Sequence, residues 1–366
     1  MAVSQTEGDY LTLHEYVRAA RQKLDGNMWD YVVGGTATET TLLRNRLGLD
    51  KLALRPRVLR DVSAIDPSHS LLGRPTRLPL LLAPVGGLES LCPGGGEMVA
   101  RAAGAFGVPF MLSSVADSSM QGVAAAATGT KIFQLYTRGD GDWVDDRVRQ
   151  AIDCGYDAFC ITVDSAVYSR RERDIARRFA KPWRAKGGLD SMSYQAAFNW
   201  NDVRRIRDRF DVPLILKGIG TAEDAALCVE EGVAVVYVSN HGGRQLDHAL
   251  GSIEVLPEVV EAVRGRATIV IDGGFSRGTD IVKALALGAD MVGIGRAYCY
   301  GLAAAGAEGI TGVLELLEAE IIECLGLLGA RRVKEINRSH VCKADPVYPA
   351  RAHSAFPLMS PFVDEY

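Results

Sequence analysis

The sequence predicts an α/β fold, a (β/α)8 TIM barrel with an N-terminal helical extension and a lid excursion after the fourth strand. Eight short apolar runs recur along the chain, and most are followed by a segment with helical spacing. The interval between the fourth and fifth runs is far longer than the others. Near-continuous apolar strands are typical of a parallel sheet buried on both faces, and eight strand–helix units close such a sheet into a barrel.

The eight predicted strands are rich in aliphatic and β-branched residues and end in small or polar residues. They cover residues 78–84, 108–114, 131–137, 158–164, 212–218, 234–240, 267–273 and 289–295. Between them lie segments such as GGEMVARAAGAFG, WVDDRVRQAIDCG and AEDAALCVEEG, which carry apolar residues at helical spacing and end at glycine. Glycine at that position is a helix C-cap signal, so these segments are predicted to be the outer helices.

The whole chain, 1–366, is predicted to form one domain, since barrels of this length are common. Residues 1–75 are expected to form helices, including LHEYVRAARQKL and MWDYVVGG, and an irregular link, ahead of a barrel over 76–330. Residues 307–329 are predicted to form a long amphipathic helix, and the Pro-rich tail 331–366 is predicted to be extended. The long interval, which ends in a helix near 200–210, follows a strand's C-terminal end and should overhang the functional face.

Composition excludes several classes of protein. The hydrophobic fraction of 48% and charged fraction of 23% are ordinary for a globular protein, and a net charge of −4 leaves no basic excess for nucleic acid. We expect no membrane span, because no apolar run approaches about 18 residues, and a cytoplasmic location. The seven cysteines are dispersed without a CxxC pair, so no metal site is predicted.

Polar residues gather where the predicted strands end, which in a barrel is one ring around a common pocket. The segment SNHGGRQLD is the densest, with His241 and Arg244 in a glycine-rich loop. A histidine there is a candidate general base, and Arg244 is suited to grip a carboxylate. The other five histidines are expected to be structural. After the seventh and eighth strands, DGGFSRGTD and GIGRAY occupy the usual phosphate site of barrels, so a phosphorylated cofactor is predicted.

From about Tyr16 to His340 the chain resembles the FMN-dependent 2-hydroxy-acid oxidase and dehydrogenase family, which includes glycolate oxidase, lactate oxidase and mandelate dehydrogenase. The motifs that carry the resemblance are WDYVVGG, LRPRVLRDV, LLAPVGG, MLSSVA, FQLY, ITVD, SRRERDI, LILKGI, VSNHGGRQLD, IDGGFSRGTDIVKALALGAD and IGRAY. The order of SNHGGRQLD, DGG and IGR is specific to this family. The resemblance implies a flavoenzyme that oxidises an L-2-hydroxy acid to the 2-oxo acid and passes electrons to O2 or another acceptor.

The resemblance also implies roles for individual residues. His241 would be the base, with Asp164 supporting the imidazolium. Arg171 and Arg244 would hold the substrate carboxylate, and Tyr31 and Tyr136 would hydrogen-bond the substrate. Whether the base takes the proton from the carbon or from the hydroxyl stays open.

For FMN, Lys217 matches the lysine near flavin N1, where positive charge favours the anionic reduced ring. The remaining cofactor positions implied by the resemblance are Pro84, Val85, Gly86, Ser113, Gln134, Thr162 and Ser239 around the ring, and Asp272, Gly273, Gly274, Phe275, Ser276, Gly295 and Arg296 on the ribityl and phosphate side.

Three positions depart from the pattern of relatives. Ser276 stands where many have arginine, which removes a phosphate-side cation, although Arg277 and Arg296 remain. Val115 replaces an aromatic residue, as in hydroxymandelate oxidase, which favours a bulky or aryl, mandelate-like substrate. Gly86 replaces a commoner alanine, as in mandelate dehydrogenase, so the choice of acceptor stays open.

The excursion after the fourth strand is shorter than in glycolate oxidase and lacks the apolar segment of membrane-associated mandelate dehydrogenases. No membrane partner is therefore expected, and a larger substrate, including one linked to a carrier or peptide, stays possible. The resemblance implies a homotetramer. The alternatives are an FMN-dependent monooxygenase acting by oxidative decarboxylation, a redox-neutral isomerase, which His241, Arg171 and Arg244 disfavour, and a binding module without activity.

Overall fold

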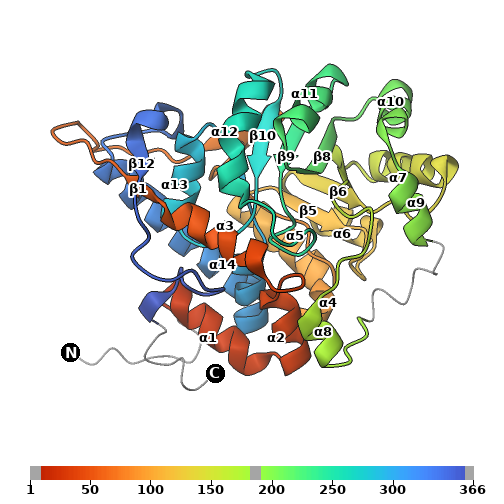
Figure 1. Ribbon diagram of the computed structural model, residues 1–366, viewed down its shortest axis with the longest axis horizontal. Coiled ribbons are helices and arrows are strands. Elements are labelled where there is room, and N and C mark those ends of the chain that lie inside the picture. The colour runs from red at the N-terminus through yellow and green to blue at the C-terminus, as the bar shows by residue number, and fades with distance from the viewer. Residues whose placement is uncertain (1–9, 182–190, 359–366) are drawn as a thin grey trace.

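The computed structural model describes residues 10–181 and 191–358, and it confirms the closed parallel barrel (Figure 1). Its strands run in the order β10-β11-β4-β5-β6-β7-β8-β9, and each overlaps one predicted run. They are β4 (Leu80–Leu82), β5 (Phe110–Ser113), β6 (Lys131–Leu135), β7 (Ala158–Thr162), β8 (Leu214–Ile219), β9 (Val235–Val238), β10 (Thr268–Ile271) and β11 (Met291–Ile294).

The apolar character of the strands follows from burial on both faces. Alternate residues of a strand point to opposite sides of the sheet, and in this barrel the two sides belong to different clusters. Leu81, Ile215 and Val270 belong to an inner cluster, whereas Leu80, Leu214 and Ile269 pack in the larger cluster that includes the outer helices. Both sets are at most 4% exposed, so neither face of the strands has room for a polar stripe.

Helices follow the strands and cover the outside of the barrel. They are α4 (Leu88–Leu91), α5 (Gly95–Phe106), α6 (Met120–Ala126), α7 (Gly141–Asp153), α10 (Trp200–Arg209), α11 (Ala222–Glu230), α12 (Ser252–Val263), α13 (Gly278–Ala286) and α14 (Arg296–Leu327). The predicted helix 307–329 is the second part of α14, which begins earlier and is broken at Ala305 and Gly306, where the φ of Gly306 is +60°.

The predicted excursion leaves the carboxyl end of β7 and contains α8 (Glu172–Ala176) and α9 (Ser191–Ala197) before α10. Residues 182–190 lie outside the described chain. Helix α8 packs near α2 (Gly26–Val33), as Figure 1 shows at the lower edge of the molecule. The excursion and the N-terminal extension therefore meet beside the same end of the barrel.

The N-terminal segment begins with the expected helices α1 (Leu13–Lys23) and α2, and α1 packs along α14. Helix α3 (Thr40–Asp50) was not predicted, because its buried face includes Thr41, Asn45 and Arg46, which hide the helical pattern of apolar residues. These polar groups are satisfied across the fold. Arg46 donates two hydrogen bonds of 2.8 Å to Asp280, and the amides of Asn45 and Asn240 pair at 2.8 and 2.9 Å.

Two small antiparallel sheets lie outside the barrel. Strands β2 (His69–Leu71) and β3 (Arg74–Thr76) form a hairpin. Strand β1 (Leu52–Leu54) pairs with β12 (Val341–Lys343), and Figure 1 shows the two together at one end of the molecule. The irregular link and the extended tail of the sequence prediction thus contain paired strands, each too short to stand out as a pattern. No helix in the described ranges is both long enough and apolar enough to span a bilayer.

Candidate functional site

A cavity of about 330 Å³ opens at the carboxyl ends of the barrel strands. This volume falls in the usual range for a small-molecule site. Its wall contains residues that follow or end every barrel strand, from Ala83–Gly86 after β4 to Gly295 after β11. Tyr31 and Val32 from α2 and Tyr168 and Arg171 from the excursion add to the wall.

The structure brings most of the predicted site residues to this cavity. Those that line it are Tyr31, Pro84, Val85, Gly86, Tyr136, Thr162, Arg171, Lys217, His241, Arg244, Asp272, Gly273, Gly274, Phe275, Ser276, Gly295 and Arg296. The other four, Ser113, Gln134, Asp164 and Ser239, are not among the residues that line it. Asp164 and Ser239 each hydrogen-bond a residue that lines it.

His241 is held by bonds to both ring nitrogens. Nδ1 lies 3.0 Å from Asp164 Oδ1, and Nε2 lies 3.2 Å from the hydroxyl of Tyr136. Burial lowers the pKa of His241, although Asp164 opposes that shift. Burial alone would raise the pKa of Asp164, but His241 and Lys217 hold it below its ordinary value. With a proton on Nδ1 donated to Asp164, Nε2 accepts the hydrogen bond of the Tyr136 hydroxyl, and its lone pair is the one that can take up a proton.

The backbone conformation of residues 241–243 fixes the direction in which this imidazole points. His241, Gly242 and Gly243 are all left-handed, with φ of +59°, +65° and +76°. Residues other than glycine rarely adopt this backbone conformation, whereas glycine adopts it without a steric penalty. A Cβ on Gly243 would stand 2.5 Å from the backbone N and Cα of Leu42, so the turn also lacks room for a larger residue.

The two arginines predicted to bind a carboxylate, Arg171 and Arg244, reach the cavity without a carboxylate partner in the described ranges. Arg244 donates to the carbonyl oxygens of Tyr31 and Gly34 at 2.6 and 2.9 Å. Burial, together with the neighbouring charge of Arg171, lowers the pKa of Arg244 to about 9. The guanidinium of Arg171 lies 5.5 Å from the centre of the Tyr168 ring and bonds Ser169 weakly at 3.4 Å. Two neighbouring like charges, both partly buried and without a counter-charge, favour an anionic ligand.

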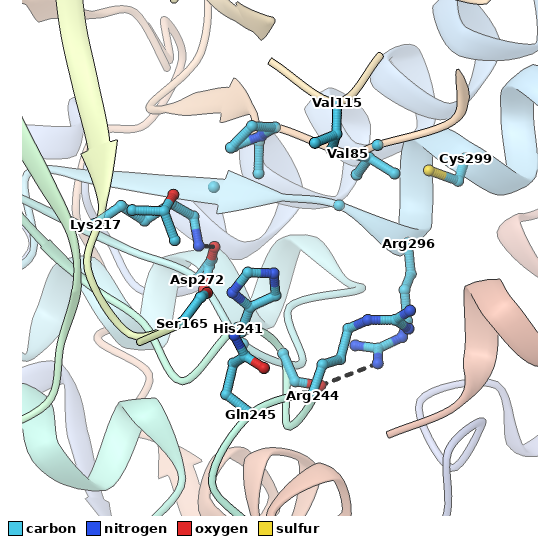
Figure 2. A pocket seen from close by; sticks show the side chains of 18 of the residues that line it. Val85, Val115, Ser165, Lys217, His241, Arg244, Gln245, Asp272, Arg296 and Cys299 are labelled. Carbon is cyan, nitrogen blue, oxygen red and sulfur yellow. Dashed lines mark hydrogen bonds and ion pairs between the residues drawn. The ribbon is translucent and has the colours of Figure 1, made fainter. Parts of the chain in front are cut away.

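Lys217, Ser239 and Asp272 form a network on another side of the cavity. The ammonium lies 2.9 Å from Asp272 Oδ2 and donates to Ser239 Oγ at 2.8 Å, and Ser239 donates to Asp272 Oδ1 at 2.5 Å. Burial alone would lower the pKa of Lys217, but Asp272 and Asp164 raise it, so a cation is fixed there. Figure 2 shows His241 between this network and the side chains of Arg244 and Arg296, with Val85 and Val115 across the cavity.

The cations predicted for a phosphate group are placed differently from one another. Arg296 lines the cavity and donates to the carbonyls of Val32, Gly34 and Gly242 at 3.0 Å each. Arg277 points to Glu320, 2.5 Å away, and does not line the cavity. The N–H groups of Ser276 and Arg277 are bonded to Asp280, so the N-terminus of α13 is capped by its own chain. Of the positions predicted for the phosphate, the loop 272–276 and the start of α14 therefore line the cavity, and Arg277 does not.

Several lining residues were not predicted as site residues, among them Arg138, Tyr168, Gln195, Gln245 and Cys299. Arg138 and Tyr168 come soon after predicted strands, so their position alone could have suggested them. Gln195 comes from α9, and whether it lines the cavity depends on how the excursion folds back, which the sequence does not indicate. Cys299 lies one turn into α14 and carries no sequence signal.

Comparison with known proteins gives one consistent result. Residues 20–343 match the family described as FMN-dependent dehydrogenase. Spinach glycolate oxidase is 39% identical over 90% of this chain and 95% of its own length. The L-lactate oxidase of Nostoc sp. is 38% identical over 90% and 97%.

Solved structures of mandelate oxidase are also similar. One aligns with a TM-score of 0.87 at 37% identity, over 93% of this chain and 100% of that chain. An active chimera of (S)-mandelate dehydrogenase aligns with a TM-score of 0.87 at 35% identity, over 92% and 100%.

Proposed function

The chain belongs to the FMN-dependent dehydrogenase family, whose members oxidise L-2-hydroxy acids with FMN, and from that premise we propose a substrate with a bulky, aryl side chain. Val115 supports this proposal, because a valine in the wall leaves more room than an aromatic residue. The mandelate oxidase structures that resemble this chain support it as well.

The residues present fit FMN. Gln134 is fully buried, and both atoms of its side-chain amide lack a hydrogen-bond partner among the described residues. On the neighbouring strand, Thr162 lines the cavity with a hydroxyl in the same condition. Buried polar groups are rarely left unpaired in a folded protein. The edge of an isoalloxazine ring carries both an N–H donor and carbonyl acceptors, which matches an amide that offers one of each.

The cofactor residues then divide by position. We assign the ring to Pro84, Val85, Gly86, Ser113, Gln134, Thr162, Lys217 and Ser239, and the ribityl phosphate to residues 272–276 with Gly295 and Arg296. When bound, FMN would take up two electrons and one proton from the substrate as its hydroxyl carbon becomes a ketone, and the other proton would go to His241. The Lys217 ammonium supplies fixed positive charge beside the ring.

The remaining residues bind and deprotonate the substrate. Arg171 and Arg244 hold its carboxylate, and Tyr31 and Tyr136 hydrogen-bond it. His241 accepts one proton at Nε2, and Asp164 stabilises the charge that then develops on the ring. The observation that carries this proposal is the convergence of the His241–Asp164 pair with two guanidinium groups around one cavity. Fixing an anion against a base in this way is catalysis by positioning.

An anaerobic screen of 2-hydroxy acids tests the proposal. Aryl substrates such as (S)-mandelate should bleach the flavin absorbance faster than glycolate or lactate. Admission of air then measures reaction with O2, and analysis of the product separates a 2-oxo acid from the shorter acid that monooxygenation would give. Faster bleaching by glycolate would contradict the aryl assignment.

The cytoplasmic location and the homotetramer stay predictions. A rice relative, 39% identical, is named a peroxisomal (S)-2-hydroxy-acid oxidase, so location varies among similar proteins.

A further inference from the structure

The cavity wall carries an unusual excess of positive charge. Its basic residues are Arg138, Arg171, Lys217, Arg244 and Arg296. Asp272 is the one carboxylate among its described lining residues, and Asp164 stands behind His241. A cavity with this balance is built for ligands that together carry several negative charges.

Four of the five cations have a partner or an assigned ligand. Lys217 is paired with Asp272 at 2.9 Å. Arg296 donates to three carbonyl oxygens on the phosphate side. Arg171 and Arg244 are assigned to the substrate carboxylate by the proposed function. Arg138 is the fifth cation, and it has neither a partner in the described ranges nor an assigned ligand.

Arg138 is half-buried in the loop between β6 and α7. Within the described ranges its guanidinium has neither a hydrogen bond nor an ion pair, and burial lowers its pKa. Two arginines outside the cavity are arranged differently. Arg46 and Arg173 each bond a carboxylate through two nitrogens, to Asp280 and Glu39 respectively. Burying part of a guanidinium without such a partner costs free energy unless a ligand supplies one.

The position of Arg138 relative to the base limits where such a ligand group can be. Tyr136, two residues earlier, places its hydroxyl 3.2 Å from His241 Nε2. Two residues of chain span at most about 7 Å, and Tyr136, Arg138 and His241 all line the same cavity, so Arg138 belongs to the wall that holds the reacting centre. Since the reacting carboxylate is assigned to Arg171 and Arg244, a group that meets Arg138 belongs to another part of the substrate.

We propose that Arg138 binds a second anionic group on the far end of the substrate side chain. The substrate class is then a 2-hydroxy acid with a distal carboxylate, sulfonate or phosphate. This inference rests on the proposed function and adds a determinant of substrate choice to it.

The test compares two substrates of similar shape, racemic 4-carboxymandelate and 4-methylmandelate, as the ratio of their kcat/KM values. The wild-type enzyme should favour the carboxylated acid. Arg138→Leu should lower its kcat/KM by about tenfold, as expected for loss of a partly desolvated charge pair, and leave that of the methyl compound within about twofold. Arg138→Lys should retain part of the preference, and added salt should reduce the preference in the wild type.

A matched control is Arg149→Leu, which removes a guanidinium from α7 that bonds Asp146 outside the cavity. The flavin spectrum and thermal melting of each variant report whether it has folded with its cofactor. An unchanged ratio in Arg138→Leu overturns the inference, and so does an equal loss for both substrates. Failure of both compounds to bleach the wild-type flavin would count against the proposed function itself.

Discussion

The carboxylate of Asp164 lies 3.0 Å from Nδ1 of His241 and receives the hydrogen bond that fixes the tautomer of the imidazole. Asp164→Asn replaces the acceptor by an amide that can donate, which favours the tautomer with a proton on Nε2. The base is then blocked, and anaerobic flavin reduction should slow by about 10²- to 10⁴-fold, as when a triad aspartate is replaced.

Stopped-flow bleaching at saturating substrate measures this rate. Asp211→Asn is the control, since Asp211 is exposed and lies outside the cavity. A variant that reduces its flavin at the wild-type rate would show that Asp164 does not orient the base.

His241→Gln should keep bound FMN and its yellow colour, because the residues assigned to the cofactor are unchanged. Loss of the proton acceptor should slow anaerobic bleaching by about 10² to 10⁴. Absorbance spectra before and after substrate addition check both parts. Bleaching at full rate in this variant would refute the assignment of the base.

The pH profile of kcat/KM should reflect the lowered pKa of His241. A base works when deprotonated, so activity should rise with pH through that pKa and be level from the ordinary value of 6.5 upward. Initial rates between pH 4.5 and 8 in one buffer mixture measure the profile. If the fall in kcat/KM on the acid side of the profile were centred above pH 7, the base of the free enzyme would carry a proton at neutral pH.

Arg171→Met should weaken binding of the substrate carboxylate by several kcal/mol if the charge pair is desolvated. This variant is cleaner than Arg244→Met, because Arg244 also donates to the backbone of Tyr31 and Gly34. Titration of the oxidised enzyme with benzoylformate, followed by the flavin spectrum, gives the Kd. The uncharged amide of benzoylformate, benzoylformamide, is the matched ligand, and its affinity should change little.

His353 links pH to stability through the C-terminal segment. Its ring stacks on Trp29 at 5.4 Å, and its Nε2 lies 3.2 Å from the hydroxyl of Tyr300. Burial and the charge of Arg296 lower its pKa to about 4. Between the ordinary 6.5 and that value the unfolded chain binds a proton that the folded chain does not, so stability should fall as the pH drops through this window.

His353→Phe keeps the stacked ring and removes the titration. The difference in Tm between pH 7 and pH 5 should therefore be smaller in this variant than in the wild type. Equal differences would show that His353 does not contribute to the acid sensitivity.

The barrel was predictable because a parallel strand buried on both faces must be apolar throughout, and that pattern is visible in one sequence. Helix α3 was not, since its buried positions include Asn45 and Arg46, whose partners Asn240 and Asp280 are about two hundred residues away. The β1–β12 pairing has the same cause, as Leu54 meets Val341 through a contact without local signal.

For the site, the motifs predicted which residues converge, and His241, Arg171 and Arg244 do line one cavity. The sequence could not show which of the charged side chains are already paired with neighbouring residues in the fold. Arg277 was expected to remain available as a cation for the phosphate, yet it faces Glu320. Arg138 was not predicted as a site residue, and among the arginines that line the cavity it is the one whose guanidinium has no hydrogen bond in the described ranges.

The left-handed turn at residues 241–243 has a consequence for evolution as well as for chemistry. A non-glycine residue in this conformation is strained by on the order of 1 kcal/mol. The free energy of folding offsets this strain, so binding of a ligand does not have to. The imidazole is thus pre-organised, with no rearrangement left to slow the reaction. Substitutions in the cavity wall, as at Val115 or Arg138, could change which substrate side chains fit, while this turn kept the proton acceptor His241 in place.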